Sequence, residues 1–142
     1  MSKVAVVYWS GTGNTKTMAE LLAKGIAEGN GEVTLKEVSE ASIEDVKNCD
    51  VLLLGSPAMG DEVIEEGEME PFVEEISGEV SGKKLVLFGS YGWGTGEWMN
   101  IWEDRMESLG AELIEREVIV NEAPEGDDEK KLIDIGLKIS KY

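Results

Sequence analysis

The sequence predicts an α/β protein built on a three-layer, doubly wound, five-stranded parallel sheet. Short apolar runs and helical patterns alternate along all 142 residues, as they do in a chain of βα units. Three of the apolar runs are nearly continuous, which burial on both faces of a parallel sheet requires. We find no linker or repeat, so residues 1–142 are expected to form one domain.

Five runs have the composition of strands. They are "KVAVVYW" (3–9), "EVTLKEV" (32–38), "DVLLLG" (50–55), "KKLVLFGS" (83–90) and "AELIEREVIV" (111–120). The first, third and fourth are the continuous apolar runs and are expected in the centre of the sheet. The second and fifth alternate with charged residues and are expected nearer its edges.

Apolar residues at helical spacing separate these runs. The first predicted helix contains Met18, Leu21, Leu22 and Ile26 and stops near Gly29, and a short second one covers 42–48. The third starts at Pro71 and continues through Phe72, Val73 and Ile76. The fourth contains Trp98, Ile101, Trp102, Arg105 and Met106 and ends at Leu109–Gly110, and the last follows Pro124 and contains Leu132, Ile133, Ile135, Gly136 and Ile139. Proline at Pro71 suits a first helical turn, where its missing N–H is not needed.

The composition excludes several kinds of site. The chain has no histidine and one cysteine, Cys49, so serine–histidine and cysteine–histidine nucleophiles and the usual zinc sites are absent. Any chemistry is therefore expected to come from a bound group. The net charge of −17 disfavours nucleic acid and anionic membranes and favours basic partners, although acidity can also serve solubility alone. Without a long apolar run, a cytoplasmic location is expected.

Three loops follow predicted strands and are expected at the carboxyl edge of the sheet, where such folds bind ligands. The first is "SGTGNT", 10–15, in which glycines expose backbone amides and hydroxyl and amide side chains add donors at a helix N-terminus. This loop can bind a phosphate with neutral groups. It lacks the lysine of a Walker loop, and Lys16 stands where a dinucleotide fingerprint has its third glycine. A tight strand-to-helix turn is an equally good interpretation.

The other two loops offer surfaces for a flat ring. In "SPAMGDE", 56–62, Met59 is a soft apolar side chain suited to an aromatic face, although an ordinary turn explains the loop alone. In "SYGWGTGEW", 90–98, three glycines display Trp93 on a flexible frame, which favours stacking on a ligand over a plain loop. Together the three loops predict a site for a phosphorylated planar heterocycle.

These motifs resemble those of the flavodoxins, specifically the short-chain clostridial type. The shared motifs are "VYWSGTGNT", "GDE" after "AM", "LFGSYGWG", "EW" and "VNE" followed by proline. They cover essentially the whole chain, and the unbroken fifth strand also fits the short-chain type. The chain departs from the family pattern at two places. Related sequences often have Cys followed by Ser or Pro where this chain has Ser56 and Pro57, and they often have an acidic residue where it has Lys16.

The resemblance implies a flavodoxin-like fold with non-covalently bound FMN. It also implies a monomer that is a low-potential one-electron carrier and not an enzyme. The carrier is expected to shuttle mainly between the semiquinone and hydroquinone states of FMN. Its expected partners are reductases and electron acceptors with basic docking surfaces. By the same resemblance, residues 10–15 take the phosphate, Met59 and Trp93 flank the ring, and the Gly60 carbonyl reorients on reduction. The implied cofactor-binding residues are Ser10, Gly11, Thr12, Gly13, Asn14, Thr15, Ser56, Pro57, Ala58, Met59, Gly60, Asp61, Glu62, Ser90, Tyr91, Gly92, Trp93 and Gly94.

Acidic residues crowd one window of the chain, 61–75. They are Asp61, Glu62, Glu65, Glu66, Glu68, Glu70, Glu74 and Glu75. One charge about 10 Å from an anionic reduced flavin costs roughly 0.4 kcal/mol in bulk water, so this window is expected to lower the reduction potential.

Two other functions fit the same fold class. A phosphoacceptor signalling domain would need acidic residues after the first and third strands, where this chain has Tyr8, Trp9 and Ser10, and Gly55 and Ser56. A flavoenzyme that reduces quinones or small substrates, or a flavodoxin-like partner of ribonucleotide reductase, is the closer alternative. The loops supply no substrate chemistry for an enzyme.

Overall fold

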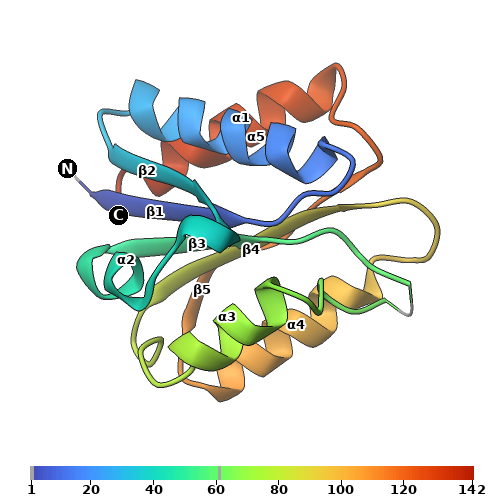
Figure 1. The fold of residues 1–142 in the computed structure, drawn as a ribbon. Helices are drawn as coiled ribbons and strands as arrows, with labels where there is room; N and C mark the ends of the chain where they lie inside the picture. The colour runs from blue at the N-terminus through green and yellow to red at the C-terminus, as the bar shows by residue number, and fades with distance from the viewer. Residues whose placement is uncertain (1, 61) are drawn as a thin grey trace.

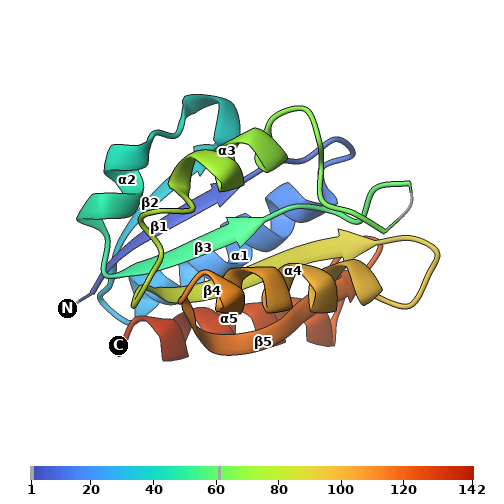
Figure 2. The ribbon, with the colours of Figure 1, turned by 90° about the horizontal axis from the view of Figure 1, so that it is seen from below.

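The computed structural model describes residues 2–60 and 62–142 and has the predicted three layers. A parallel sheet lies between α1 and α5 on one face and α2, α3 and α4 on the other (Figures 1 and 2). None of the helices in the described ranges is both long and apolar enough to cross a membrane.

The five strands stand in the order β2-β1-β3-β4-β5. They are β1 (Lys3–Tyr8), β2 (Glu32–Glu37), β3 (Val51–Gly55), β4 (Lys84–Tyr91) and β5 (Glu112–Asn121). Every neighbouring pair is parallel. The continuous apolar strands β1, β3 and β4 occupy the centre, and the alternating β2 and β5 form the edges, as their patterns predict. The predicted second strand is one residue too long, because Val38 begins a short 3-10 turn, Val38–Glu40, instead of ending β2.

The helices lie where the sequence places them. They are α1 (Asn14–Glu28), α2 (Ile43–Asn48), α3 (Met69–Ile76), α4 (Glu97–Ser108) and α5 (Asp127–Ile139). One start differs from the prediction, since α3 begins before Pro71. The buried Glu65 carboxylate accepts hydrogen bonds from the amides of Glu68 and Met69, both at 2.8 Å, and so satisfies donors at the start of this helix. The proline still falls within the first turn, where it is tolerated.

Two apolar cores lie on opposite faces of the sheet. Along β1, Val4, Val6 and Tyr8 pack toward α1 and α5, whereas Ala5 and Val7 pack toward the other helices. This alternation follows from the two-residue period of a strand. Because both faces are buried, the strand ends and their loops carry the exposed functional groups.

Strand β5 is continuous but irregular. Its register with β4 shifts near Val86, and Glu117 has a positive φ of 54°. The Glu103 side chain of α4, only 3% exposed, accepts a hydrogen bond from the Glu117 amide at 2.8 Å. The irregularity is therefore held by a buried carboxylate on the neighbouring helix.

Candidate cofactor site

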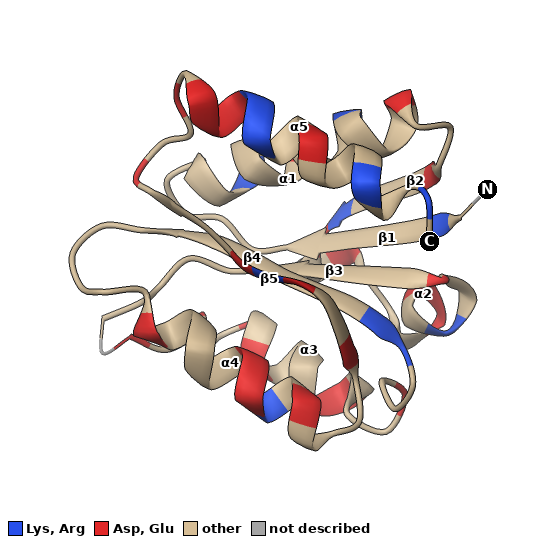
Figure 3. Cartoon of the chain, turned by 180° about the vertical axis from the view of Figure 1, so that it is seen from behind, with Lys and Arg blue, Asp and Glu red and all other residues tan. Residues whose placement is uncertain are grey.

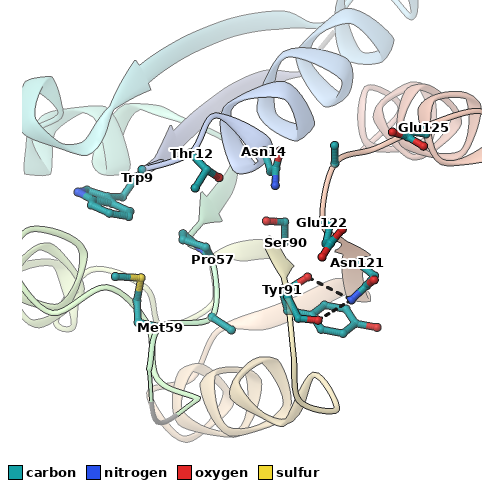
Figure 4. Close-up of a pocket in the computed structure, with 14 residues that line it drawn as sticks. Trp9, Thr12, Asn14, Pro57, Met59, Ser90, Tyr91, Asn121, Glu122 and Glu125 are labelled. Carbon is teal, nitrogen blue, oxygen red and sulfur yellow. Dashed lines mark hydrogen bonds between the residues drawn. The ribbon is translucent and has the colours of Figure 1, made fainter.

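A cavity of about 600 Å³ opens at the carboxyl edge of the sheet. Figure 4 shows its lining side chains, with Thr12 and Asn14 on one side and Pro57 and Met59 facing them from another loop. The lining residues are Trp9, Gly11, Thr12, Asn14, Pro57, Ala58, Met59, Ser90, Tyr91, Gly92, Asn121, Glu122, Ala123 and Glu125. They lie at the ends of β1, β3, β4 and β5 or in the segments that follow, so four strand ends build the site.

The loop after β1 is folded around the Ser10 hydroxyl. Its oxygen accepts hydrogen bonds from the amides of Gly13, at 3.1 Å, and Lys16, at 3.2 Å. Gly13 has a φ of 103°, a left-handed conformation that favours glycine, where the chain turns into α1. A Cβ at Gly11 would lie 3.1 Å from the indole of Trp9, so a larger residue there would require this side chain to shift.

The N-terminus of α1 is suited to an external anion. Its first turn contains no acidic residue, whereas the first turns of α2, α3, α4 and α5 all do. Within the described residues, no protein group accepts a hydrogen bond from the amides of Asn14 and Thr15. The helix dipole and these amides favour negative charge at this end of the cavity.

Hydrogen bonds join the three predicted loops. The Thr15 hydroxyl accepts from the Ser90 amide at 3.4 Å, and the Ser90 carbonyl accepts from the Ala58 amide at 3.0 Å. Thr15, which is buried, does not line the cavity but fixes the loop after β1 to the loop after β4. The three loops therefore form one connected edge.

The loop after β3 contains a tight hairpin. The Met59 amide donates to the Val63 carbonyl, and the Glu62 amide donates to the Met59 carbonyl, both at 2.8 Å. Glu62 has a φ of 55°, the left-handed conformation that often closes a three-residue hairpin turn. Gly60 lies at the turn, and a Cβ built there meets nothing within 4 Å.

The loop after β4 presents Trp93 to solvent. Its side chain is 75% exposed and does not line the cavity, whereas Trp9 does. The Asn121 side-chain amide donates to the carbonyls of Tyr91, at 3.2 Å, and Gly92, at 2.9 Å, which fixes the base of this loop (Figure 4). Gly94 and Gly96 both have positive φ.

Half of the predicted site residues line the cavity. These nine are Gly11, Thr12, Asn14, Pro57, Ala58, Met59, Ser90, Tyr91 and Gly92. Eight lie in the same loops without lining it: Ser10, Gly13, Thr15, Ser56, Gly60, Glu62, Trp93 and Gly94. Asp61 lies outside the described residues. A role of these residues in holding a cofactor stays a prediction.

Five residues that line the cavity are not among the site residues predicted from the sequence: Trp9, Asn121, Glu122, Ala123 and Glu125. The last four could have been predicted from their position at the end of the fifth strand, since all strands of a parallel sheet end at the same edge. Trp9 was assigned to the first strand, but β1 ends one residue earlier. Its indole N–H donates to the Glu68 carboxylate at 3.2 Å.

The cavity fits FMN in size and donor chemistry. Its volume lies within the range of small-molecule sites, about 300–1,000 Å³. One end offers amides, Thr12 and Asn14 for a phosphate, and the other offers Pro57, Met59 and aromatic side chains for a ring. Among the described residues, no lysine or arginine lines it, and no cluster of candidate metal ligands is present.

Comparisons with known proteins agree with this chemistry. The family model described as "Flavodoxin" matches residues 6–136. The chain is 53% identical to a flavodoxin of Clostridium beijerinckii, over 95% of this chain and 97% of that one, and 44% identical to a flavodoxin of Megasphaera elsdenii, over 90% and 93%.

The fold comparison gives the same result. The solution structure of two-electron reduced Megasphaera elsdenii flavodoxin superposes with a TM-score of 0.87, at 43% identity, over 95% of this chain and 98% of that chain. The predicted fold class and electron-transfer class are thereby confirmed, and the phosphoacceptor and flavoenzyme alternatives are not supported. The chain belongs to the flavodoxin family, FMN-containing low-potential electron carriers that are not enzymes.

Proposed function

We propose that residues 1–142 act as a single FMN-binding domain that passes one electron at a time between redox proteins, with FMN in the cavity at the carboxyl edge of the sheet. The observation that supports this proposal best is that the N-terminus of α1, which has no acidic residue in its first turn, borders a 600 Å³ cavity. The same cavity is also lined by apolar and aromatic side chains. When bound, FMN supplies the one-electron redox chemistry.

The phosphate end of the site is neutral. Thr12 and Asn14 line it, and Asn14 is the first residue of α1, whose N-terminal amides favour an anion. We propose that they bind the phosphate of FMN without a cation, so that its negative charge is not cancelled. An uncancelled charge disfavours adding electrons to the ring and contributes to a low potential.

At the ring end, Met59 and Pro57 form one wall of the cavity. We propose that Trp93 covers the opposite face of the ring. Its high exposure supports this role, because a 75% exposed indole on a glycine-rich loop has apolar surface available to stack on a ligand. Trp9, which lines the cavity, is a further candidate for ring contact.

The proposed partners are redox proteins with basic docking surfaces. The protein is proposed to bind them as a monomer in the cytoplasm. The charge of −17 supports this choice, since it attracts basic proteins and repels nucleic acid and anionic membranes. Such encounters are expected to be transient and to weaken as salt rises.

Comparing FMN with riboflavin tests the phosphate site directly. Thr12→Ala should weaken FMN binding roughly 10- to 150-fold, because a hydrogen bond to a charged group contributes about 1.5–3 kcal/mol. Riboflavin lacks the phosphate, so its binding should not change. Calorimetric titration of both ligands measures this difference, and Thr34→Ala on the exposed face of β2 is the matched control. Equal weakening of both ligands would place the phosphate elsewhere.

A further inference from the structure

A small hollow of about 110 Å³, here named the α4 hollow, lies between the loop after β3 and helix α4. Its apolar walls are Val63 and Ile64 from the loop and Trp98, Ile101 and Trp102 from the helix. The α4 hollow shares no lining residue with the 600 Å³ cavity, so the two are separate features of the molecule.

Two of these walls are exposed to solvent. Ile101 is 57% exposed and Val63 is 40% exposed, whereas Ile64, Trp98 and Trp102 are buried. The described residues include five exposed large apolar side chains, and two of the five border this one hollow. A single exposed apolar side chain is ordinary. Two that border the same hollow form an apolar surface that a binding partner can cover.

Carboxylates surround the α4 hollow. Glu97 lies four residues before Ile101 on α4, and Asp104 lies three residues after it, so both are its neighbours on the helix surface. Glu66 follows the buried Ile64 by two residues in the loop after β3. These three carboxylates are exposed, and none of them forms an ion pair within the described parts of the chain. Figure 3 shows further acidic residues along α4.

The cation that lines the α4 hollow does not offset this charge. Arg105 donates hydrogen bonds to both carboxylate oxygens of Glu70, at 2.7 Å each. The two charges cancel one another, and the three exposed carboxylates stay uncompensated. The α4 hollow therefore has an apolar centre and a negative rim.

We propose that the α4 hollow is a docking site for a basic redox partner, which inserts one aliphatic side chain between Val63 and Ile101. Lysines or arginines of the partner then lie against Glu66, Glu97 and Asp104. The hollow is smaller than the sites of about 300–1,000 Å³ that hold small-molecule ligands, and its size suits a single side chain. An apolar centre with a polar rim is the usual arrangement of a protein–protein interface. A second copy of this chain is disfavoured, because both copies carry a charge of −17.

The α4 hollow lies next to the proposed FMN site. The Met59 amide donates to the Val63 carbonyl at 2.8 Å, so one hairpin carries a wall of the 600 Å³ cavity and a wall of the α4 hollow. That the partner is a redox protein rests on the proposed function. A partner bound in the hollow contacts the hairpin that borders FMN.

Two synthetic peptides test the α4 hollow. One has a leucine between two runs of three lysines, and the other has alanine in place of the leucine. In a titration of ¹⁵N-labelled protein as purified, the leucine peptide should shift the amide signals of Val63, Ile64 and Ile101 most. It should bind at least about fourfold more tightly than the alanine peptide, which is the effect of burying one methylene group. Equal affinity of the two peptides, or largest shifts outside the hollow, would overturn the proposal.

This titration requires neither FMN nor electron transfer. Protein that binds the leucine peptide in the hollow but binds no FMN would support the docking site and refute only the proposed function. Signals of Val63 and Ile101 that move with protein concentration alone would show that a second copy fills the hollow, and would overturn the proposal.

A substitution at the rim separates the apolar contact from general effects. Ile101→Ser should abolish the preference for the leucine peptide while leaving the affinity for the alanine peptide unchanged. Leu35→Ser is the matched control, because Leu35 is an exposed apolar residue of the edge strand β2, and it should keep the preference. Circular dichroism shows whether both variants are folded. A preference for leucine that persists in Ile101→Ser would overturn the proposal.

A pair of charge variants tests the negative rim. Glu97→Gln/Asp104→Asn should weaken binding of both peptides by the same factor, because each peptide carries the same lysines. The effect should exceed that of Glu32→Gln/Glu112→Gln, which removes equal charge at the starts of β2 and β5. Both effects should shrink as salt rises. Equal weakening by the two charge variants would contradict a docking site on α4.

Discussion

Glu103 is the clearest case of a single residue with an unusual environment. The residue is 3% exposed, and burial raises the pKa of its carboxyl group above the ordinary value of 4.5. The Glu117 amide and Arg116 act in the opposite direction but do not cancel the effect of burial. The carboxyl group nevertheless fixes the irregular part of β5, so its protonation state affects stability and local structure together.

Glu103→Gln should become relatively more stable than the wild type as pH rises. A raised pKa means that the native state binds the proton more tightly, so this contribution is present below about pH 4.5 and is lost as pH rises through the native pKa. Each unit of pKa shift corresponds to about 1.4 kcal/mol. Urea unfolding of both proteins between pH 4 and 7 measures the difference, with Asp104→Asn on the exposed side of α4 as control. A difference independent of pH would contradict the role of burial.

At the scale of elements, α1 and α5 approach through two glycines. A Cβ at Gly136 would lie 2.3 Å from the Leu22 carbonyl oxygen, and one at Gly25 would lie 2.0 Å from the Ile133 carbonyl oxygen. Both clashes are with backbone, which cannot move without displacing a helix. Side chains are therefore excluded where the two helices meet.

Gly136→Ala should destabilise the fold by about 1–3 kcal/mol, the usual effect of overpacking, despite the better helix propensity of alanine. Thermal or urea unfolding gives the change in the free energy of unfolding. Gly78→Ala is the matched control, because an added Cβ meets nothing within 4 Å there, and it should change stability by less than about 1 kcal/mol. Equal stability of the two variants would refute the close helix approach.

The elements themselves follow well from sequence, because their causes are local. Continuous apolar runs placed β1, β3 and β4 in the sheet, and glycine after a helical pattern marked the end of α1. The start of α3 depends on Glu65, and the irregularity of β5 depends on Glu103, each through contacts to backbone. The periodicity of apolar residues in a sequence does not predict which carboxylate will accept a hydrogen bond from a given backbone amide.

The site was predictable to the extent that its loops carry unusual composition. The glycines around 10–15 and 90–96 marked two of the loops that meet at the cavity. Asn121 and Glu122 have ordinary composition and were missed, because only the parallel packing of β5 brings them to the same edge.

At the scale of the molecule, the acidic residues differ in where they lie and in what they contact. Figure 3 shows acidic residues along α4, β5 and the start of α5, with lysines farther along α5. Within the acidic window, Glu70 is paired with Arg105 and Glu65 binds backbone amides. Glu122 and Glu125, outside that window, line the cavity itself. These two are thus better placed to influence a bound flavin than several members of the window.

Neutralising Glu122 and Glu125 together should raise the reduction potential of bound FMN by on the order of 35 mV at low salt. Each charge about 10 Å away contributes roughly 0.4 kcal/mol, and 2.3 kcal/mol corresponds to 100 mV. Screening should shrink the shift as salt rises. Potentiometric titration compares Glu122→Gln/Glu125→Gln with Glu32→Gln/Glu112→Gln, which removes equal charge at the starts of β2 and β5. Identical shifts in both variants would show that only net charge matters.

The proposed roles of the loop residues all depend on FMN lying in the 600 Å³ cavity, and an amide chemical-shift titration with FMN tests this location most directly. Saturation at one FMN per chain is expected, with the largest shifts within 10–15, 57–62, 90–94 and 121–125. Smaller cavities exist on α5, beside Lys130 and Lys138, and at the opposite edge of the sheet, beside Lys3 and Cys49. Largest shifts at either of these, with the four loop segments unchanged, would contradict the account.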